Sequence, residues 1–460
     1  MHSVPFRFPV HAHPPSLHRF MALLLVLGGW MATTLPAQAL PSFARQTGDD
    51  CTSCHIGAFG PQLTPHGIAF KLGGYTDGNG SGSLPLSGMA MGTWTHTQKG
   101  QPDGAGPNDG ANDNASLQEV SLFLAGALTE HLGGFVQTTY SDLGSRKIGL
   151  DQTDVRYAQT LELGGKETIL GVTFNNNPTV TDPFNTLSVW RFPYTGSELV
   201  PGPVAAPMID GGLGQQVGGL SAYGLWDNAI YAEIGGYRTL SRSALESLNV
   251  IAKGDPLDRT DGVAPYGRIA YYQDRHKSAW HLGLFGFAPD LQLDGGPGDT
   301  DKYRDLGVDA SFQYLGARQH IFTLNTAYVH EDRTLDASFI EGGADRRSGH
   351  LNRFDLSGSY YYDQTWGLTA ALFDVQGSAD SILYGGESRL GSPDSRGYIL
   401  QADWTPFGKE GAWGAPWANL RLGLQYTVYT QLNGAKSDYD GAGRDAKDNN
   451  TLFAYVWTAF

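Results

Sequence analysis

Apolar and polar residues alternate along many short segments of this chain. At 306–314 one side of an extended strand is apolar, and the residues between are polar or small; the apolar set is Leu306, Val308, Ala310, Phe312 and Tyr314. The same period of two recurs at 398–404 and 420–428. Alternation over about ten residues is what a strand crossing a membrane needs.

Sixteen such strands can be placed by this pattern. They cover 86–99, 115–128, 132–142, 151–163, 167–176, 216–226, 229–239, 264–273, 278–288, 303–315, 319–330, 350–363, 366–376, 394–405, 418–430 and 451–460. Short turns such as 164–166 alternate with long loops such as 177–215 and 431–450. A large soluble sandwich also alternates, but it has no reason to sort its loops by length. The pattern therefore predicts an all-β fold, a 16-stranded antiparallel transmembrane β-barrel with both chain ends on the periplasmic side.

The two ends of the chain support export to the bacterial outer membrane. Residues 1–39 read as a signal peptide, with Arg7 and Arg19 ahead of an apolar core and Ala37-Gln-Ala39 as the cleavage pattern. After Met31 no run of 18 or more apolar residues follows, which argues against a helical membrane protein. The last residues, 451–460, are aromatic and strand-like, as in the sorting signal of outer-membrane barrels.

Composition and charge narrow the function classes. The chain has 62 Gly, 22 Tyr, 21 Phe and 10 Trp spread through its body, and its net charge of −15 argues against nucleic-acid binding. Several acids fall in the predicted external loops: Asp290, Asp294, Asp299, Asp301, Asp438, Asp440, Asp445 and Asp448. Such carboxylates can concentrate divalent cations, or only keep the loops soluble.

The one motif with specific chemistry is Cys51-Thr-Ser-Cys54-His55, which holds both cysteines of the chain. Cys-x-x-Cys-His is the attachment site of c-type haem: the two thiols form thioethers, and the histidine binds the iron as proximal ligand. A disulfide across two residues is a poor structural staple. A thioredoxin-like redox pair needs a βαβ pattern, which is absent. The motif predicts one covalently bound haem c.

Residues 40–85 form a small haem-binding, cytochrome c-like module ahead of the barrel at 86–460. So short a segment depends on the haem for buried apolar surface, and we expect it at the periplasmic mouth or in the lumen. A helix near Pro65 is expected to pack Ile68 and Leu72 on the porphyrin, and 73–83 reads as a linker. For the distal iron ligand we favour Met89 and keep His66 as the alternative, with Met91 and His96 also near.

The chain resembles the fused outer-membrane cytochrome–porins of the iron-oxidase type. The matching residues are Phe43-Ala-Arg-Gln-Thr-Gly48 before the cysteines, Pro61-Gln-Leu-Thr-Pro65, Phe70-Lys71 and Gly74-Tyr75 after them, and Pro85-Leu-Ser-Gly-Met89 at the first strand. In the barrel, Asn175-Asn-Asn-Pro-Thr179, Asp182-Pro183 and Asn185-Thr186 resemble a loop of these porins. The likeness covers essentially the whole mature chain, and it assigns Cys51, Cys54 and His55 to the haem.

This resemblance implies an oxidoreductase without acid, base or nucleophile residues, since the cofactor carries the chemistry. Electrons from extracellular Fe(II) are expected to pass through the haem to a soluble periplasmic cytochrome or another carrier. The alternatives are an electron conduit for another donor or acceptor, and a diffusion porin whose haem module is structural. Outer-membrane lipid is the expected surrounding.

Overall fold

The computed structural model describes residues 41–78, 85–143, 147–296, 298–409, 411–412 and 417–460. The predicted signal peptide, 1–39, and part of the predicted linker at 73–83 lie outside the described residues.

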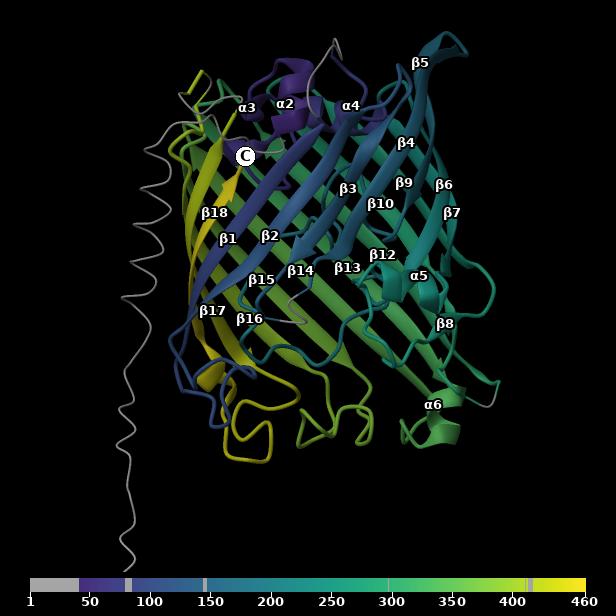
Figure 1. Ribbon diagram of the computed structural model, residues 1–460, viewed down its shortest axis with the longest axis vertical. Helices are drawn as coiled ribbons and strands as arrows, with labels where there is room; N and C mark the ends of the chain where they lie inside the picture. Colours follow the sequence, from purple (N-terminus) through teal and green to yellow (C-terminus); the bar gives the residue numbers. More distant parts are fainter. Residues whose placement is uncertain (1–40, 79–84, 144–146, 297, 410, 413–416) are drawn as a thin grey trace, which may run out of the picture.

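In the described ranges one sheet holds 18 strands, all pairing antiparallel with their neighbours. Two are short pieces within long connections, β8 (Arg259–Thr260) and β11 (Asp290–Gln292). The other sixteen follow one another in chain order around a closed barrel (Figure 1). They are β1 (Leu86–Thr97), β2 (Asn114–Ala127), β3 (Leu132–Tyr140), β4 (Gly149–Leu163), β5 (Lys166–Asn175), β6 (Val217–Trp226), β7 (Ile230–Thr239), β9 (Ala264–Asp274), β10 (Ser278–Phe287), β12 (Thr300–Tyr314), β13 (His320–Leu335), β14 (Ser348–Tyr362), β15 (Trp366–Gly377), β16 (Ser395–Trp404), β17 (Asn419–Gln431) and β18 (Thr451–Ala459). The predicted 16-stranded barrel is confirmed.

The first and last strands close the barrel. β1 pairs with β18 from Met89 opposite Ala459 to Thr97 opposite Thr451. Beyond this ladder, the Phe460 amide donates to the Gly88 carbonyl at 2.8 Å. Closure leaves no unpaired sheet edge, which is the condition for a sheet to cross a bilayer.

The connections at the two ends of the barrel differ, as the sequence predicts. At one end tight hairpins join the strands: Gly164 and Gly165 have φ values of 62° and 73°, and Asp227 and Asn228 have 53° and 49°. Two positive φ values in a row are the mark of a two-residue I′ turn, whose twist matches that of the strands. The long loops gather at the other end, where α6 (Asp336–Glu341) also lies (Figure 1).

The barrel wall is apolar outside and polar inside. Outward side chains stay exposed, with Ile234 at 74% and Leu306 at 66%. Inward ones such as Arg156 and Arg421 are fully buried. This pattern is the reverse of that in a soluble protein, whose surface is polar and whose core is apolar. It is the architecture of an outer-membrane β-barrel. In the described residues no helix has the length and apolarity to span a membrane.

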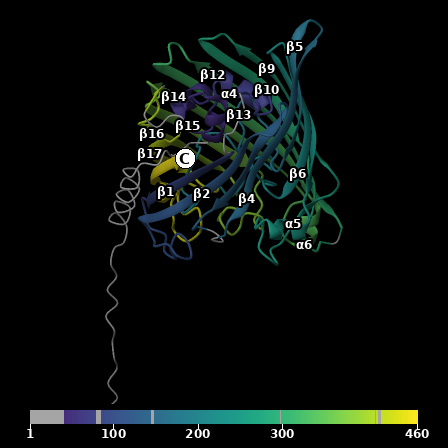
Figure 2. The same cartoon turned by 45° about the horizontal axis from the view of Figure 1, so that its top comes forward.

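Two segments fill the lumen. The haem-motif module, residues 41–78, consists of α2 (Pro41–Thr47), α3 (Cys51–Cys54), the 3-10 turn η1 (Ile56–Ala58) and α4 (Pro65–Leu72). It lies in the mouth at the short-turn end, as Figure 2 shows from above, so the structure agrees with the expected placement.

The second segment is the connection between β5 and β6, residues 176–216, called the inner loop below. The sequence predicts an external loop at 177–215, and this prediction is wrong. The loop folds inward because its polar groups find partners on the inner wall; Thr179, Thr181 and Asp182 are fully buried. The remaining helical pieces, α5 (Arg242–Ser247) and the 3-10 turn η2 (Ala446–Asn449), belong to other long connections.

Candidate functional site: a cavity around the haem motif

Backbone bonds fix the haem motif in a tight turn. The His55 amide donates to the Cys51 carbonyl at 2.8 Å, which closes α3, and the Thr64 amide donates to the Cys54 carbonyl at 2.9 Å. Thr64 also caps α4, since its hydroxyl accepts from the Gly67 amide at 3.2 Å. Cys51, Cys54 and His55 therefore stand next to one another, with both thiols free of a disulfide.

These three side chains line a cavity of about 350 Å³, called the haem-motif cavity. The volume lies in the range of about 300–1,000 Å³ that is usual for cofactor sites. Three parts of the chain build the walls, and most of the lining is aromatic or apolar. The module supplies Phe43, Phe59 and Phe70; the barrel supplies Met89, Phe123, Phe135, Trp457 and Ala459; the inner loop supplies Val189, Trp190 and Tyr194.

Two buried nitrogens at this cavity, His55 Nδ1 and Trp457 Nε1, have no hydrogen-bond partner among the described residues. Burial lowers the pKa of His55 to about 4, so its imidazole is neutral at pH 7, and the neutral ring is the form that binds a metal. Burial also raises the pKa of the Cys51 thiol, and that of Cys54 to about 12. A largely apolar cavity lined by two thiols and a neutral imidazole fits a haem c.

The candidates for the distal ligand differ in position. Met89 lines the cavity and is 9% exposed. His66 does not face it: Nε2 lies 2.9 Å from Asp49 Oδ2, and the side chain is 42% exposed. Met91 accepts a hydrogen bond at Sδ from the Thr195 hydroxyl at 3.1 Å. His96 contacts Asp113 at 2.9 Å. Of the four, only Met89 shares the cavity with His55, and its binding to iron stays a prediction.

One packing expectation is wrong. Ile68 and Leu72 do not face the cavity; they pack with Ala158, Ile169 and Tyr223 of the barrel wall. Phe70 and Lys71 line the cavity instead. Because α4 lies against the wall inside the lumen, its apolar stripe meets strands rather than a cofactor.

Hydrogen bonds to the inner wall hold the module in place. Their distances are Gly57 N to Gln364 Oε1 2.8 Å, Asn419 Nδ2 to Ala58 O 2.7 Å, Gln313 Nε2 to Leu63 O 2.8 Å and Tyr223 Oη to Leu72 O 2.7 Å. Tyr75 Oη also donates to Asp154 Oδ2 at 2.7 Å, and that carboxylate pairs with Arg156 at 2.8 Å with both side chains fully buried. The module is thus fixed on several sides of the lumen.

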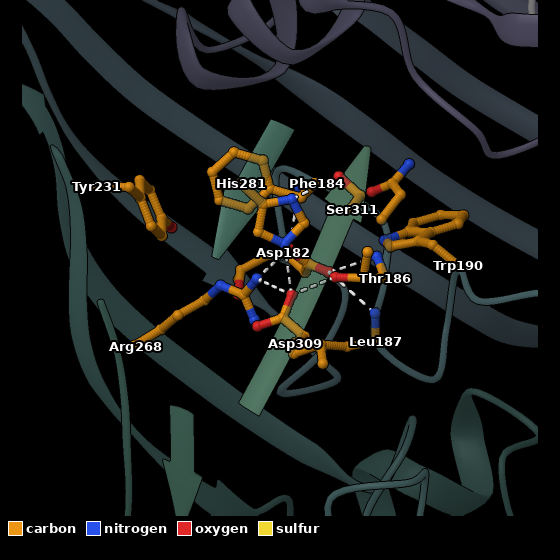
Figure 3. A network of polar contacts seen from close by, with 12 residues as sticks. Asp182, Phe184, Thr186, Leu187, Trp190, Tyr231, Arg268, His281, Asp309 and Ser311 are labelled. Carbon is orange, nitrogen blue, oxygen red and sulfur yellow. Dashed lines mark hydrogen bonds and ion pairs between the residues drawn. The ribbon is translucent and has the colours of Figure 1, made fainter. Parts of the chain in front are cut away.

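A second buried network anchors the inner loop to the wall (Figure 3). Asp182 accepts from the amides of Phe184, Thr186 and Leu187 at 2.8–3.0 Å. The Asp182 carboxylate also accepts from the Thr186 hydroxyl at 3.2 Å and pairs with Arg268 at 3.2 Å. Arg268 lies 2.7 Å from Asp309 as well. His281 Nε2 is 2.7 Å from the same Asp309 oxygen, and the ring of Phe184 stacks on His281 at 4.1 Å.

The inner loop is joined to the module as well. Lys71 Nζ donates to Asp182 O at 2.6 Å and to Asn185 Oδ1 at 3.0 Å, and Asn185 Nδ2 donates to Pro61 O at 2.6 Å. Lys71 also stands 5.1 Å from the centre of the Trp190 ring. The inner loop and the module therefore form one connected filling of the lumen, and both are bonded to the barrel wall.

The sequence singled out Met89 among the cavity residues outside the module, but not the aromatic ones. Phe453, Tyr455 and Trp457 point inward from β18, where a porin lumen is expected to be polar. The sequence feature that could have predicted them is β18, which is apolar on both faces. Its inward apolar face needs a packing partner inside the lumen.

The acidic loops do not form a metal site in this structure. Across the described residues, no group of three or more His, Cys, Asp or Glu side chains is placed to hold a metal ion.

Comparison with known proteins adds the following. No family model matches the chain. No curated protein matches it either. Similar solved structures include OprB of Pseudomonas putida (10% identity, TM-score 0.48, 82% of this chain and 94% of that chain). Others are an anion-selective porin from Comamonas acidovorans (13%, 0.45, 81% and 98%) and the outer membrane channel DcaP of Acinetobacter baumannii (11%, 0.45, 82% and 97%). Because these TM-scores are low, the porin-like fold is inferred from the strand pairing described above and not from these similarities.

Proposed function

We propose that this protein carries a haem c in the bacterial outer membrane and transfers electrons from extracellular Fe(II) to a periplasmic cytochrome or similar carrier. The observation that carries the proposal is the cavity that gathers Cys51, Cys54 and His55 in the periplasmic mouth of a membrane barrel. A bound haem c would supply one-electron redox chemistry, which protein side chains cannot provide.

Each part of the chain has a distinct role in this proposal. Cys51 and Cys54 would hold a bound haem c through thioether bonds, and His55 would be a ligand of its iron. The aromatic walls exclude water around it. The overall step removes one electron from Fe(II), giving Fe(III), and reduces the carrier by one electron. No proton moves and no covalent bond changes, so the site needs no general acid or base.

A diffusion porin with a structural haem module is the second candidate. The barrel itself favours it, since barrels of sixteen strands can enclose an aqueous channel. The module and the inner loop, which occupy the lumen of this barrel, favour electron transfer. Flux of a small sugar into liposomes that carry the haem-loaded protein separates the two candidates: rapid flux supports the porin, and a tight barrel supports electron transfer.

Stopped-flow mixing tests the main proposal. The purified, oxidised full-length protein is mixed without oxygen with a ferrous salt while the haem absorption bands are followed. We expect conversion to the reduced spectrum, and transfer onward when an oxidised periplasmic cytochrome is added. A colourless purified protein, or a haem that Fe(II) leaves oxidised, contradicts the proposal. The matched control is the double variant Cys51→Ala, Cys54→Ala, which keeps the barrel but lacks the covalent attachment.

A further inference from the structure

A short stretch of the inner loop, residues 189–197, has a cavity on each side. Trp190 and Tyr194 line the haem-motif cavity. Arg191, Phe192 and Ser197 line a second cavity of about 240 Å³, called the outer cavity. Its remaining walls are residues 200–206 of the inner loop and parts of β13 to β18. The stretch is therefore a partition between the haem-motif cavity and a second cavity on the side of the lumen away from the module.

At one point two aromatic rings span this partition. Phe192 and Tyr194 meet edge to face with their centres 5.4 Å apart. On the haem side, the Tyr194 hydroxyl donates to Gln62 Oε1 of the module at 3.3 Å. On the outer side, Phe192 packs in a buried cluster with Phe373 and Tyr429. A molecule in the outer cavity is thus separated from the haem-motif cavity by one pair of side chains.

The charged lining of the outer cavity selects the chemistry of its ligand. Arg191 and Arg353 contact Asp355 at 3.3 and 2.8 Å, and they contact Asp210 at 2.9 and 3.2 Å. Each carboxylate thus serves both guanidinium groups, while each guanidinium has five N–H donors. The two carboxylates balance the charge of the two arginines, so the cluster is neutral, but its N–H donors outnumber the bonds that these contacts use. The spare groups are donors, so the cavity suits a small molecule rich in acceptor oxygens. Arginine forks match carboxylates in particular, and a bare divalent cation is unsuited to a lining with two arginines.

We propose that the outer cavity binds a small polycarboxylate, and that Fe(II) reaches the protein as a carboxylate complex held there. This inference rests on the proposed function and adds where and in what form the donor binds. The ferrous complex would give up one electron and become ferric, and a haem c held by Cys51, Cys54 and His55 would take up that electron. Phe192 and Tyr194 lie between the two cavities. The step breaks no bond and transfers no proton.

Two neighbouring alanines of β15 provide a matched test of binding. Ala371 points inward and lines the outer cavity, whereas Ala370 is exposed on the outer face of the barrel. Ala371→Phe fills the cavity, and Ala370→Phe adds the same ring on the lipid side. Ala205→Phe fills the cavity from the inner loop. This second filled variant keeps the test valid if Ala371→Phe does not fold. Heat-dependent gel mobility and the haem spectrum report the fold of each.

Iron-free citrate is the probe for the site. Calorimetric titration is expected to show binding to the haem-loaded wild type and to Ala370→Phe, and about tenfold or weaker binding to the two filled variants, a loss of at least 1.4 kcal/mol. Absence of citrate binding to the wild type, or equal binding to all four proteins, overturns the site.

Ferrous citrate then tests the electron path by stopped flow. Haem reduction is expected to slow about tenfold in Ala371→Phe and Ala205→Phe, in step with the lost binding, and to keep the wild-type rate in Ala370→Phe. Wild-type rates in both filled variants overturn the path. If citrate binds the wild type but neither ferrous citrate nor ferrous sulfate reduces its haem, the proposed function fails and the binding site stands.

Discussion

Met89 and Met91 point into the lumen from the same strand, two residues apart, yet only Met89 lines the haem-motif cavity. We expect Met89→Ala to change the spectrum of the reduced haem and to lower its midpoint potential, because methionine ligation raises that potential. Met91→Ala is the matched control and is expected to leave both unchanged. The measurement is a spectroelectrochemical titration of the purified protein. An unaltered spectrum in Met89→Ala, with a changed one in His66→Ala, assigns the ligand to His66 instead.

Lys71 gives the molecule a pH-dependent contact. Burial lowers the pKa of its amine to about 7, with the nearby charge of Arg156 acting in the same direction; a free lysine has a pKa of about 10.4. Between these two values the unfolded chain binds a proton that the folded chain does not. The contribution of Lys71 to stability therefore rises as the pH rises through this window.

The comparison of Lys71→Met with the wild type measures this effect. We expect the wild type to gain stability relative to the variant between about pH 7 and pH 10, read as the temperature at which the barrel loses its compact gel mobility. Lys277→Met, in an exposed turn, is the control and should follow the wild type. A difference in stability between the wild type and Lys71→Met that stays constant across this pH range disproves the lowered pKa of Lys71.

At the scale of elements, the inner loop depends on Asp182. Removal of this buried carboxylate in Asp182→Ala leaves three loop amides without an acceptor and takes one partner from Arg268. Loss of one partner from a buried pair costs about 3–5 kcal/mol, so we expect the loop to detach and become open to proteolysis from the outer side. Asp294→Ala breaks an exposed pair with Arg242, worth about 0–1 kcal/mol, and is the control. Equal protease resistance in both variants contradicts the anchoring role.

The strands were predictable from the sequence and the inner loop was not, for a physical reason. A strand such as β12 shows a period of two because lipid and lumen impose opposite demands on alternate residues. The loop at 176–216 carries no period. Its direction is decided by Asp182 meeting Arg268, and Lys71 meeting Asn185, across large distances in the chain. Such pairs leave no trace in a single sequence.

For the whole molecule, the module is expected to act as the plug of the barrel. Deletion of 41–78 removes none of the strand pairs that close the barrel, so the barrel should still form. We expect solute flux in liposomes to rise well above that of the full-length protein. The double variant Cys51→Ala, Cys54→Ala keeps the module and is the control. Equal flux in the deletion and in the full-length protein argues against a plug.

The sequence alone predicted the motif residues, the barrel and the module at its mouth. It predicted Met89 at the haem motif but not the three-part cavity, because Trp190 and Trp457 join Met89 only when the chain is folded. Trp457 is separated from the motif by nearly the whole length of the barrel sequence, and an isolated tryptophan in a last strand reads as an interface residue.

The seam between β1 and β18 has a consequence for biogenesis. Trp457 and Ala459 of β18 form one wall of the cavity around the motif cysteines, which lie far earlier in the chain. Until β1 and β18 pair, the cavity lacks the wall that Trp457 and Ala459 provide; once they pair, that wall is in place. If a haem c is attached at this motif, we therefore expect attachment to be easier before the barrel closes than after it.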